Sequence, residues 1–559
     1  MTTNKKTGKG DSTQYVRFAR EFKAQNGVMC FLIDFMPGSA ADGLEMAVIR
    51  RASLFQRYFD CDIIIFTNLY QSRITEDTQR QIELGRIQRL KVINLYDYVQ
   101  GINRNGQNTS QIEPVLPELD PSWKIESGRE KHDTSVTDKN GKTVMYIRRY
   151  PSGQGVDYIC YYTKGRLSRR DTYDLLGFIS RMEFMDPTDG TILQRVYLRP
   201  DHSVALMERP GHGLLPGKNA NDYAIDLLDR KGNTALHFFS HDELIAWWLL
   251  TMLRDKSVLY MLICDRPSYY QRSFREFGKR KEEYSNIRTI CIPHSRHTLT
   301  EDTLNGELSY NYGYLADRSV NMDAVCTLTD WQRDDIVNRY GDNDRLFAVI
   351  PHFLDPISNP GHTSLASNIL PPHSMILVGR LTRGKGQFEA LSVLKKVLQR
   401  VPDATLHFFG KGEDEAVLRQ KAAQEQLADK VFFHGFVTEM PPVYDQASLL
   451  LSCSMVEAFG LVILEALFHG CPVVAFNVRY GPSSMIKEGE DGYLHPLGDL
   501  DGMAAHCADI LSDEKLRNRL SDGARKIAES FLPSAIAAKW AELLGAVLPR
   551  RKQSASSRE

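Results

Sequence analysis

Ser-Met-Val-Glu-Ala-Phe-Gly-Leu-Val-Ile-Leu-Glu-Ala-Leu-Phe-His-Gly, residues 454–470, is the stretch that says most about this chain. Gly460 can turn the backbone sharply, and the apolar residues after it have the spacing of a helix. We therefore expect Glu457 in the loop before a helix and Glu465 on its second turn. The first N–H groups of such a helix point at the loop and can bind an anion. A helix-capping carboxylate and a solvated surface residue are the plain alternative for the two glutamates.

A second motif follows the expected strand 374–378 and reads Gly-Arg-Leu-Thr-Arg-Gly-Lys-Gly, residues 379–386. Arg380 can grip phosphate oxygens with its planar fork, Lys385 adds a point charge, and the glycines let backbone approach a ligand. Neither Gly-x-x-x-x-Gly-Lys-Ser/Thr nor a helix-opening Gly-x-Gly-x-x-Gly occurs, which disfavours ATPase and dinucleotide sites. Together the two motifs favour a sugar nucleotide, with the diphosphate on the cations and helix tip and the hydroxyls on the carboxylates.

These motifs, in this order, resemble the nucleotide-sugar half of retaining GT-B glycosyltransferases of family 4. Within that family the chain is most similar to the bacterial enzymes of wall teichoic acid, poly(glycerol-phosphate) alpha-glucosyltransferase and poly(ribitol-phosphate) N-acetylglucosaminyltransferase. Their hallmark is a β-rich insertion in the N-terminal domain. The segments that carry the resemblance are Gly379–Lys385, Phe409-Gly410-Lys411-Gly412, His434-Gly435-Phe436-Val437, Glu457–Glu465, Tyr480-Gly481-Pro482 and Glu488–Leu494.

The expected fold class is therefore α/β, with two facing Rossmann-like domains of the GT-B type and an antiparallel β insertion. Strands and helices alternate over the first hundred residues, whereas turn signals between short alternating runs follow residue 102. A stretch rich in Pro, Ser, Asn and Gly, 354–372, is the expected interdomain linker. The expected parts are 1–101 and 225–360 for the two halves of the N-terminal, acceptor-side domain, 102–224 for the insertion, 361–531 for the nucleotide-sugar domain, and 532–559 for a crossover helix and basic tail.

The resemblance also implies how the donor is held. Arg380 and Lys385 would neutralise the leaving diphosphate in place of a metal ion. Glu465 would bind the ribose hydroxyls and Glu457 the donor sugar, with front-face substitution and no protein nucleophile. Further donor contacts are expected from Gly43, Gly410, Lys411, Val437, Phe459, Gly460 and Leu461.

The acceptor side is expected beyond the carboxyl end of the strand 287–292, where Pro-His-Ser-Arg-His follows. In the resembling family a histidine here contacts the donor sugar, and we assign that role to His294 with His297 as the second choice. A structural histidine pair is the competing interpretation, while zinc lacks further ligands at the right spacing. Tyr480 is also placed on the acceptor side. Gly43 has the alternative of an ordinary loop glycine.

Composition and charge exclude several classes. The chain has 559 residues, 42% hydrophobic residues and a net charge of -1, which does not suggest a nucleic-acid binder. Met1–Gln14 has no apolar export segment, and the apolar stretch 244–253 is far shorter than the roughly 20 residues of a bilayer span. We expect a cytoplasmic protein with at most peripheral membrane contact. The nine scattered cysteines are interpreted as reduced core residues.

No metal cofactor is expected. The Asp-x-Asp motifs at 60–62, 342–344 and 499–501 do not follow apolar strands and are interpreted as surface turns.

The resemblance implies a hexosyltransferase that moves glucose, from UDP-glucose, or N-acetylglucosamine, from UDP-N-acetylglucosamine, to a poly(polyol-phosphate) wall polymer. Ser484 stands where relatives often carry an acid, so the choice of hexose stays open. One alternative is glycosylation of Ser or Thr in a surface adhesin. Another is a catalytically silent GT-B subunit that only binds a partner or glycan. By analogy with the teichoic-acid enzymes, we also expect a homo-oligomer formed through the insertion. The arginines of the insertion would attract a polyanion unless its acidic residues balance them.

Overall fold

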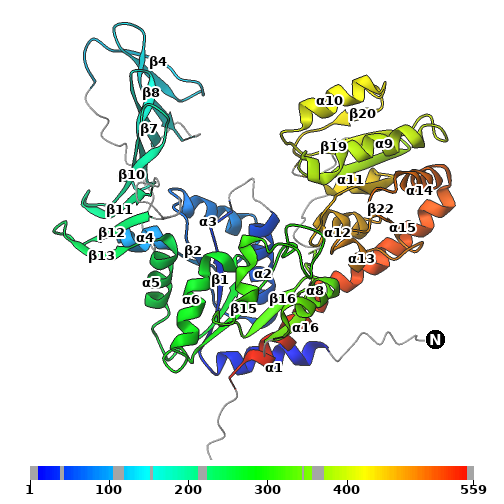
Figure 1. Ribbon diagram of the computed structural model, residues 1–559, viewed down its shortest axis with the longest axis horizontal. Helices are drawn as coiled ribbons and strands as arrows, with labels where there is room; N and C mark the ends of the chain where they lie inside the picture. Colours follow the sequence, from blue (N-terminus) through cyan, green and yellow to red (C-terminus); the bar gives the residue numbers. More distant parts are fainter. Residues whose placement is uncertain are drawn as a thin grey trace, which may run out of the picture.

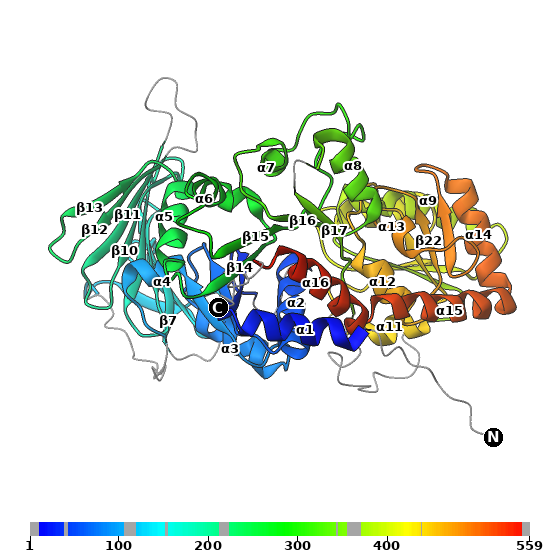
Figure 2. The ribbon, with the colours of Figure 1, turned by 90° about the horizontal axis from the view of Figure 1, so that it is seen from below.

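The computed structural model describes residues 11–37, 43–104, 119–150, 155–211, 223–342, 345–354, 370–437 and 439–549. Three sheets follow one another along an elongated molecule (Figures 1 and 2). An antiparallel sheet lies at one end, a parallel sheet lies in the middle, and a second parallel sheet lies at the other end. The α/β class and the antiparallel sheet in the N-terminal half are therefore confirmed.

The middle sheet has seven parallel strands in the order β17-β16-β15-β14-β1-β2-β3. Its central strands are buried runs of apolar residues, as expected of a parallel sheet covered on both faces. The strands come from two segments of the chain that the insertion separates. They are β1 (Gly27–Ile33), β2 (Ile63–Thr67), β3 (Lys91–Asn94), β14 (Leu259–Cys264), β15 (Ile287–Cys291), β16 (Ala324–Thr327) and β17 (Leu346–Val349).

The helices of this unit cover its sheet. In α5 the side chain of Trp248 is fully buried, and most of the apolar stretch 244–253, which is too short to span a bilayer, packs in the core. In the described parts of the chain, no helix combines the length and the apolar character that crossing a membrane requires. The helices are α1 (Asp11–Lys23), α2 (Gly43–Phe59), α3 (Ile74–Glu83), α4 (Leu95–Gln100), α5 (His241–Met252), α6 (Pro267–Lys279), α7 (Gly313–Ala316) and α8 (Asp330–Tyr340).

The inserted sheet has ten antiparallel strands in sequential order. The Glu208 carboxylate accepts hydrogen bonds from the hydroxyls of Tyr96 (3.0 Å) and Tyr197 (3.1 Å), which ties β11 to α4 of the middle unit. The strands are β4 (Lys124–Ser127), β5 (Thr134–Thr137), β6 (Thr143–Arg149), β7 (Val156–Thr163), β8 (Arg166–Tyr173), β9 (Ile179–Met185), β10 (Ile192–Leu198), β11 (Val204–Pro210), β12 (Tyr223–Leu228) and β13 (Thr234–Phe238).

The insertion ends later than the sequence analysis placed it. The expected boundary at residue 224 falls inside β12, and the sheet continues to Phe238. The hairpin β12–β13 closes through Asp229, whose carboxylate accepts hydrogen bonds from the N–H groups of Lys231 (2.8 Å) and Asn233 (2.9 Å). The α/β alternation resumes only at α5, which Ser240 caps.

The C-terminal unit has six parallel strands in the order β20-β19-β18-β21-β22-β23. Its strands are β18 (Ser374–Val378), β19 (Thr405–Phe409), β20 (Val431–Phe433), β21 (Leu449–Ser452), β22 (Val473–Phe476) and β23 (Gly492–His495). Its helices are α9 (Gln387–Val397), α10 (Glu415–Gln424), α11 (Pro441–Gln446), α12 (Leu461–Phe468), α13 (Pro482–Met485), α14 (Leu500–Ser512) and α15 (Glu514–Ala528). Most of the expected linker, 355–369, lies outside the described residues.

The last helix, α16 (Pro533–Val547), leaves the C-terminal unit and packs on α1 and α2 of the middle unit (Figure 2). The Trp540 ring meets Phe55 edge to face, with centroids 5.3 Å apart, and the Arg51 guanidinium lies 5.4 Å from the Trp540 ring centroid. The Arg288 guanidinium donates a hydrogen bond to the Val547 carbonyl. The crossover helix that the sequence analysis expected therefore returns to the N-terminal half.

Replacing Trp540 by alanine should lower the free energy of unfolding by about 3–5 kcal/mol, because it removes a large buried ring and leaves a cavity under Phe55. Urea unfolding followed by tryptophan fluorescence and circular dichroism measures the change. The control Lys539→Ala alters an exposed neighbour on the same helix and should stay within about 0.5 kcal/mol of the parent protein. Equal stabilities for the two variants would contradict this packing.

Candidate functional site

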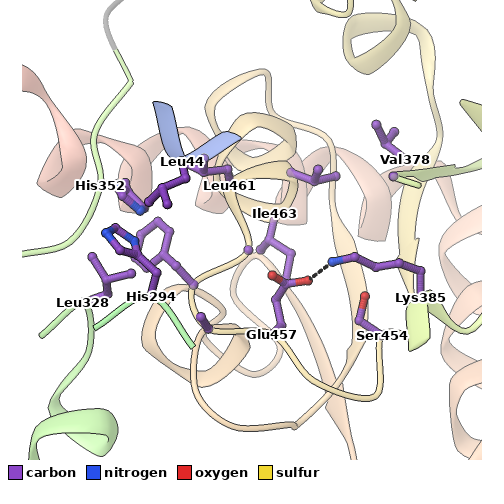
Figure 3. A pocket seen from close by; sticks show the side chains of 15 residues that line it. Leu44, His294, Leu328, His352, Val378, Lys385, Ser454, Glu457, Leu461 and Ile463 are labelled. Atoms are coloured by element: carbon purple, nitrogen blue, oxygen red, sulfur yellow. Dashed lines mark hydrogen bonds and ion pairs between the residues drawn. The ribbon is translucent and has the colours of Figure 1, made fainter. Parts of the chain in front are cut away.

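A cavity of about 300 Å³ opens between the two parallel-sheet units. Figure 3 shows residues of the middle unit on one side and residues of the C-terminal unit on the other. The middle unit contributes Leu44, His294, Leu328 and His352. The C-terminal unit contributes Val378, Gly379, Lys385, Ser454, Glu457, Ala458, Phe459, Gly460, Leu461, Val462 and Ile463.

The cationic turn is held by close backbone contacts that only glycine permits. Gly386 has φ +72°, and a Cβ there would lie 1.9 Å from the Cys453 carbonyl oxygen at the end of β21. Gly410 has φ +144°, and a Cβ there would lie 1.9 Å from the Gly379 carbonyl oxygen. The glycines that were expected to admit a ligand thus also let the turns after β18 and β19 pack together. Met455 reinforces this by donating its N–H to the Gly384 carbonyl (3.0 Å).

The loop before α12 follows the sequence expectation. Gly460 has φ +89°, stands at the N-cap of α12, and provides no side-chain cap for the first N–H groups of the helix. Because α12 begins at the cavity, its partial positive charge points where Leu461 and Val462 line the wall. Glu457 lies in the loop just before this tip, and Glu465 lies on α12.

Lys385 and Glu457 form an ion pair inside the cavity, with 2.6 Å between Nζ and Oε2 (Figure 3). The two side chains come from different segments, the turn after β18 and the loop before α12. An ammonium group has three hydrogens to donate, and the contact with Glu457 uses one of them. The site therefore places a cation, a helix N-terminus and a carboxylate within one small cavity, which suits a ligand that combines phosphate with hydroxyl groups.

His294 faces this pair from the middle unit (Figure 3). Its Nε2 lies 2.7 Å from Oδ1 of Asp265, a fully buried carboxylate that also accepts two hydrogen bonds from Arg51, at 3.0 and 2.8 Å. Burial would raise the pKa of Asp265, but the Arg51 charge and the His294 hydrogen bond outweigh it and hold that pKa well below its usual range. Asp265 is therefore ionised and orients the imidazole, so that a neutral His294 carries its lone pair on Nδ1.

His352 completes this side of the cavity. Its ring stacks on His294, with centroids 5.8 Å apart, and meets Phe459 edge to face at 5.2 Å. Burial, together with the nearby His294 and Arg51, lowers the pKa of His352 well below its usual range, so the ring is neutral near pH 7. The ring of His352 thus joins His294 of the middle unit to Phe459 of the C-terminal unit.

Other predicted donor residues lie outside the cavity lining. Arg380 and Lys411 are exposed. The turns that carry them are joined by a hydrogen bond from the Leu381 N–H to the Lys411 carbonyl (3.0 Å). Val437 is half-buried against the core. Glu465 accepts a hydrogen bond from the buried Tyr444 hydroxyl (2.9 Å), and this contact turns its carboxylate toward α11. Gly43 begins α2 next to Leu44, which does line the cavity.

The two further acceptor-side candidates are buried. The His297 side chain is fully enclosed, and its Nε2 lies 3.0 Å from the Thr303 carbonyl oxygen, which fits the competing interpretation of a structural histidine. Burial lowers its pKa. The Tyr480 ring is also fully buried and packs edge to face on Trp331 at 6.1 Å.

The Asp-x-Asp motifs lie away from the cavity. Asp60 pairs with Lys23 and Arg89 at the surface. Asp499 caps α14 by accepting the Gly502 N–H, so Asp501 lies in a helix rather than a turn. Asp342 is exposed, and 343–344 lie outside the described residues. Within the described ranges there is no group of three His, Cys, Asp or Glu side chains arranged to hold a metal ion.

All nine cysteines are free thiols in the core, as the sequence analysis expected.

Sequence reasoning missed Asp265, Leu328 and His352. Each one follows the carboxyl end of a strand of the middle sheet, namely β14, β16 and β17. Such positions line the crevice of open α/β sheets, and this rule, applied above only to β15, could have found them. Arg51 gave no comparable signal, because it lies within α2 and its role depends on a partner far away in the sequence.

Replacing Asp265 by asparagine should lower the free energy of unfolding by about 3–5 kcal/mol, because it leaves the buried Arg51 guanidinium without a counter-charge. Urea unfolding at pH 7 measures the loss. The double variant Arg51→Met/Asp265→Asn removes both charges and should be less destabilised than the single variant. A double variant that is the less stable of the two would contradict the pairing.

Comparison with known proteins places this geometry in context. Residues 369–527 match the family described as Glycosyl transferases group 1. The chain is 23% identical over 521 residues to poly(glycerol-phosphate) alpha-glucosyltransferase of Bacillus subtilis (strain 168), across 91% of this chain and 74% of that protein. It is 25% identical over 541 residues to the GtfA subunit of UDP-N-acetylglucosamine--peptide N-acetylglucosaminyltransferase of Streptococcus gordonii, across 91% and 96% of the two chains.

Among solved structures, the fold is similar to that of a mutant of TarM from S. aureus in complex with fondaparinux, alpha-GlcNAc-glycerol and UDP. The TM-score is 0.71 at 18% sequence identity, and the similarity covers 92% of this chain and 99% of that one. The likeness thus includes the inserted sheet as well as both parallel sheets. Residues 369–527 thus match a glycosyl transferases group 1 domain, and the fold as a whole is similar to the GT-B type that the resemblance implied.

Proposed function

We propose that this protein is a retaining hexosyltransferase that moves glucose or N-acetylglucosamine from a UDP-sugar to the polyol of a poly(polyol-phosphate) wall polymer. The observation that carries the proposal is the ion pair of Lys385 and Glu457 at the tip of α12, with His294 facing it from the other unit. The two parallel-sheet units act as the facing donor and acceptor lobes of a GT-B enzyme. The B. subtilis and S. aureus relatives support this choice of reaction.

The diphosphate of the donor binds against Lys385 and the first N–H groups of α12. As the glycosidic bond breaks, negative charge builds on the departing UDP, and a fixed cation and helix tip stabilise that charge. Arg380, exposed on the same turn, is the second cation that we assign to the diphosphate. Glu465, on α12, binds the ribose hydroxyls of the nucleotide.

The transfer proceeds on the front face of the sugar. A polyol hydroxyl oxygen bonds to the anomeric carbon as the bond from that carbon to the phosphate oxygen breaks, and the bonding electrons leave with UDP. The hydroxyl proton passes to an oxygen of the departing phosphate. Glu457 and His294 hold the hydroxyls of the sugar, so no protein nucleophile takes part. The new glycoside keeps the configuration of the donor.

The cationic turn replaces a divalent metal in this scheme, and the reaction is therefore metal-independent. The protein works in the cytoplasm, where UDP-sugars are made, and assembles with copies of itself through the inserted sheet. A silent binding subunit is the weaker interpretation, since the chain keeps both Lys385 and the Glu457 carboxylate in one cavity.

A second acceptor is supported by the S. gordonii relative, whose name describes transfer to peptide. In that case the hydroxyl nucleophile would come from a Ser or Thr side chain, and the donor chemistry would be unchanged.

Labelled UDP-glucose and UDP-N-acetylglucosamine, each offered with purified poly(glycerol-phosphate), poly(ribitol-phosphate) or a serine-rich peptide, test donor and acceptor together. We expect label on a polymer and not on the peptide, with the same rate in EDTA as in Mg²⁺. Label on the peptide alone would overturn the acceptor, and loss of transfer in EDTA would overturn metal independence. A protein that shows neither transfer nor slow hydrolysis of the UDP-sugar would support the silent-subunit alternative.

Replacing Lys385 by alanine should lower kcat on the order of 10²-fold, because the departing diphosphate loses its nearest cation. Steady-state transfer assays measure the effect. Lys395→Ala is the matched control, since it removes an exposed lysine of α9 that pairs with Glu425. A Lys385→Ala enzyme as fast as the control would remove Lys385 from the mechanism.

A further inference from the structure

An ion pair joins the two parallel-sheet units beside the cavity. Arg479, in the loop after β22, places its Nε 2.7 Å from Oδ2 of Asp335, on α8 of the middle unit. The Asp335 side chain is 10% exposed and that of Arg479 is 31% exposed. A pair this deep is costly to break from one side, because the remaining charge stays partly out of water.

Trp331, which lies one turn before Asp335 on α8, contacts the same loop. The Arg479 guanidinium lies 4.7 Å from the Trp331 ring centroid, and the buried Tyr480 ring meets Trp331 edge to face. Residues four apart on a helix share a face, so Trp331 and Asp335 hold Arg479 between a ring and a carboxylate.

The loop that carries Arg479 is hydrogen-bonded directly to the Glu457 backbone. The Glu457 N–H donates to the Arg479 carbonyl (3.1 Å), and the Glu457 carbonyl accepts from the N–H groups of Tyr480 and Gly481. At Gly481 a Cβ would lie 1.7 Å from the Phe459 carbonyl oxygen, so the two loops are in backbone contact. Movement of Arg479 therefore moves the backbone that carries the Glu457 carboxylate.

The same helix also holds the backbone around His294. Gln332, fully buried on α8, donates hydrogen bonds from Nε2 to the carbonyls of Pro293 (3.1 Å) and Ser295 (3.2 Å), on either side of His294. One helix thus contacts both loops that face each other across the cavity, through Gln332 on one side and through Trp331 and Asp335 on the other.

We infer that α8 is an interlobe clamp, in which Asp335 and Trp331 bind Arg479 and so set the distance between Glu457 and His294. Arg479, Asp335 and Trp331 are positioning residues, since each acts through the Glu457 backbone. The inference rests on the proposed function for its kinetic consequence and stands on the contacts alone for its structural one. When the clamp is broken, the donor contacts within the C-terminal unit stay intact, but the distance between Glu457 and His294 is no longer fixed.

Hydrogen exchange tests the clamp without any substrate. In Asp335→Asn and Arg479→Met, peptides covering 454–460 should exchange faster than in the parent protein, because the Glu457 N–H is bonded to the Arg479 carbonyl. The control Asp334→Asn changes the exposed neighbour of Asp335 on α8 and should leave this exchange unchanged. Equal exchange in Asp335→Asn and Asp334→Asn would overturn the clamp, whether or not the protein is a transferase.

Transfer kinetics then test what the clamp does. Asp335→Asn should lower kcat at least tenfold and leave the Kd for UDP within about twofold of the parent value, since Lys385 and α12 are untouched. The exchanged pair Asp335→Arg/Arg479→Asp should regain part of kcat, and Arg479→Lys, which keeps the charge without the planar stack, should fall between. A parent-like kcat in Asp335→Asn would overturn the clamp. So would a folded exchanged pair no faster than the single variants. An inactive parent protein with accelerated exchange in Asp335→Asn would instead refute the proposed function alone.

Discussion

The contact between Lys385 Nζ and Glu457 Oε2 is the interaction on which the site depends. It joins the turn after β18 to the loop before α12, and both segments need glycine to come this close. Gly386 packs its backbone against Cys453, while Gly460 turns the chain into α12. The result is a cation and a carboxylate beside a helix N-terminus, in a cavity of about 300 Å³ between the two units. Under the proposed function, the diphosphate would meet these positive groups already in place.

The middle unit supplies the opposite wall, behind which two buried charges neutralise each other. Arg51 and Asp265 cancel each other in the core, so His294 is oriented by a carboxylate without a net negative charge behind it. His352 is neutral and bridges His294 to Phe459 of the other unit. Trp540 packs under Arg51, so the crossover helix supports this wall from behind. One hydrophobic core therefore runs through both units at the cavity, since Leu328 of this wall and Phe459 and Ile463 of the opposite side belong to the same buried cluster.

The motifs and the resemblance that they carry predicted the two parallel sheets, the crossover helix and a ligand site shared by Lys385 and Glu457, because each signal is local: an apolar strand, a glycine turn, a charged residue and a helix. Long-range partners were out of reach. Nothing in the sequence near Glu465 indicates that the Tyr444 hydroxyl donates a hydrogen bond to it, and nothing near His297 shows that its ring is enclosed by the core. The end of the insertion was missed because 225–238 was assigned to the returning α/β unit, although its alternation around Gly232 is that of a hairpin.

A crystal structure of the protein with UDP, from crystals grown in the presence of EDTA, tests the central claim most directly. The account predicts the β-phosphate within hydrogen-bond distance of Lys385 Nζ and of the first N–H groups of α12, with Glu457 turned toward the place of the sugar. A diphosphate bound away from α12, or one that binds only when a divalent ion bridges it to carboxylates, would contradict the account.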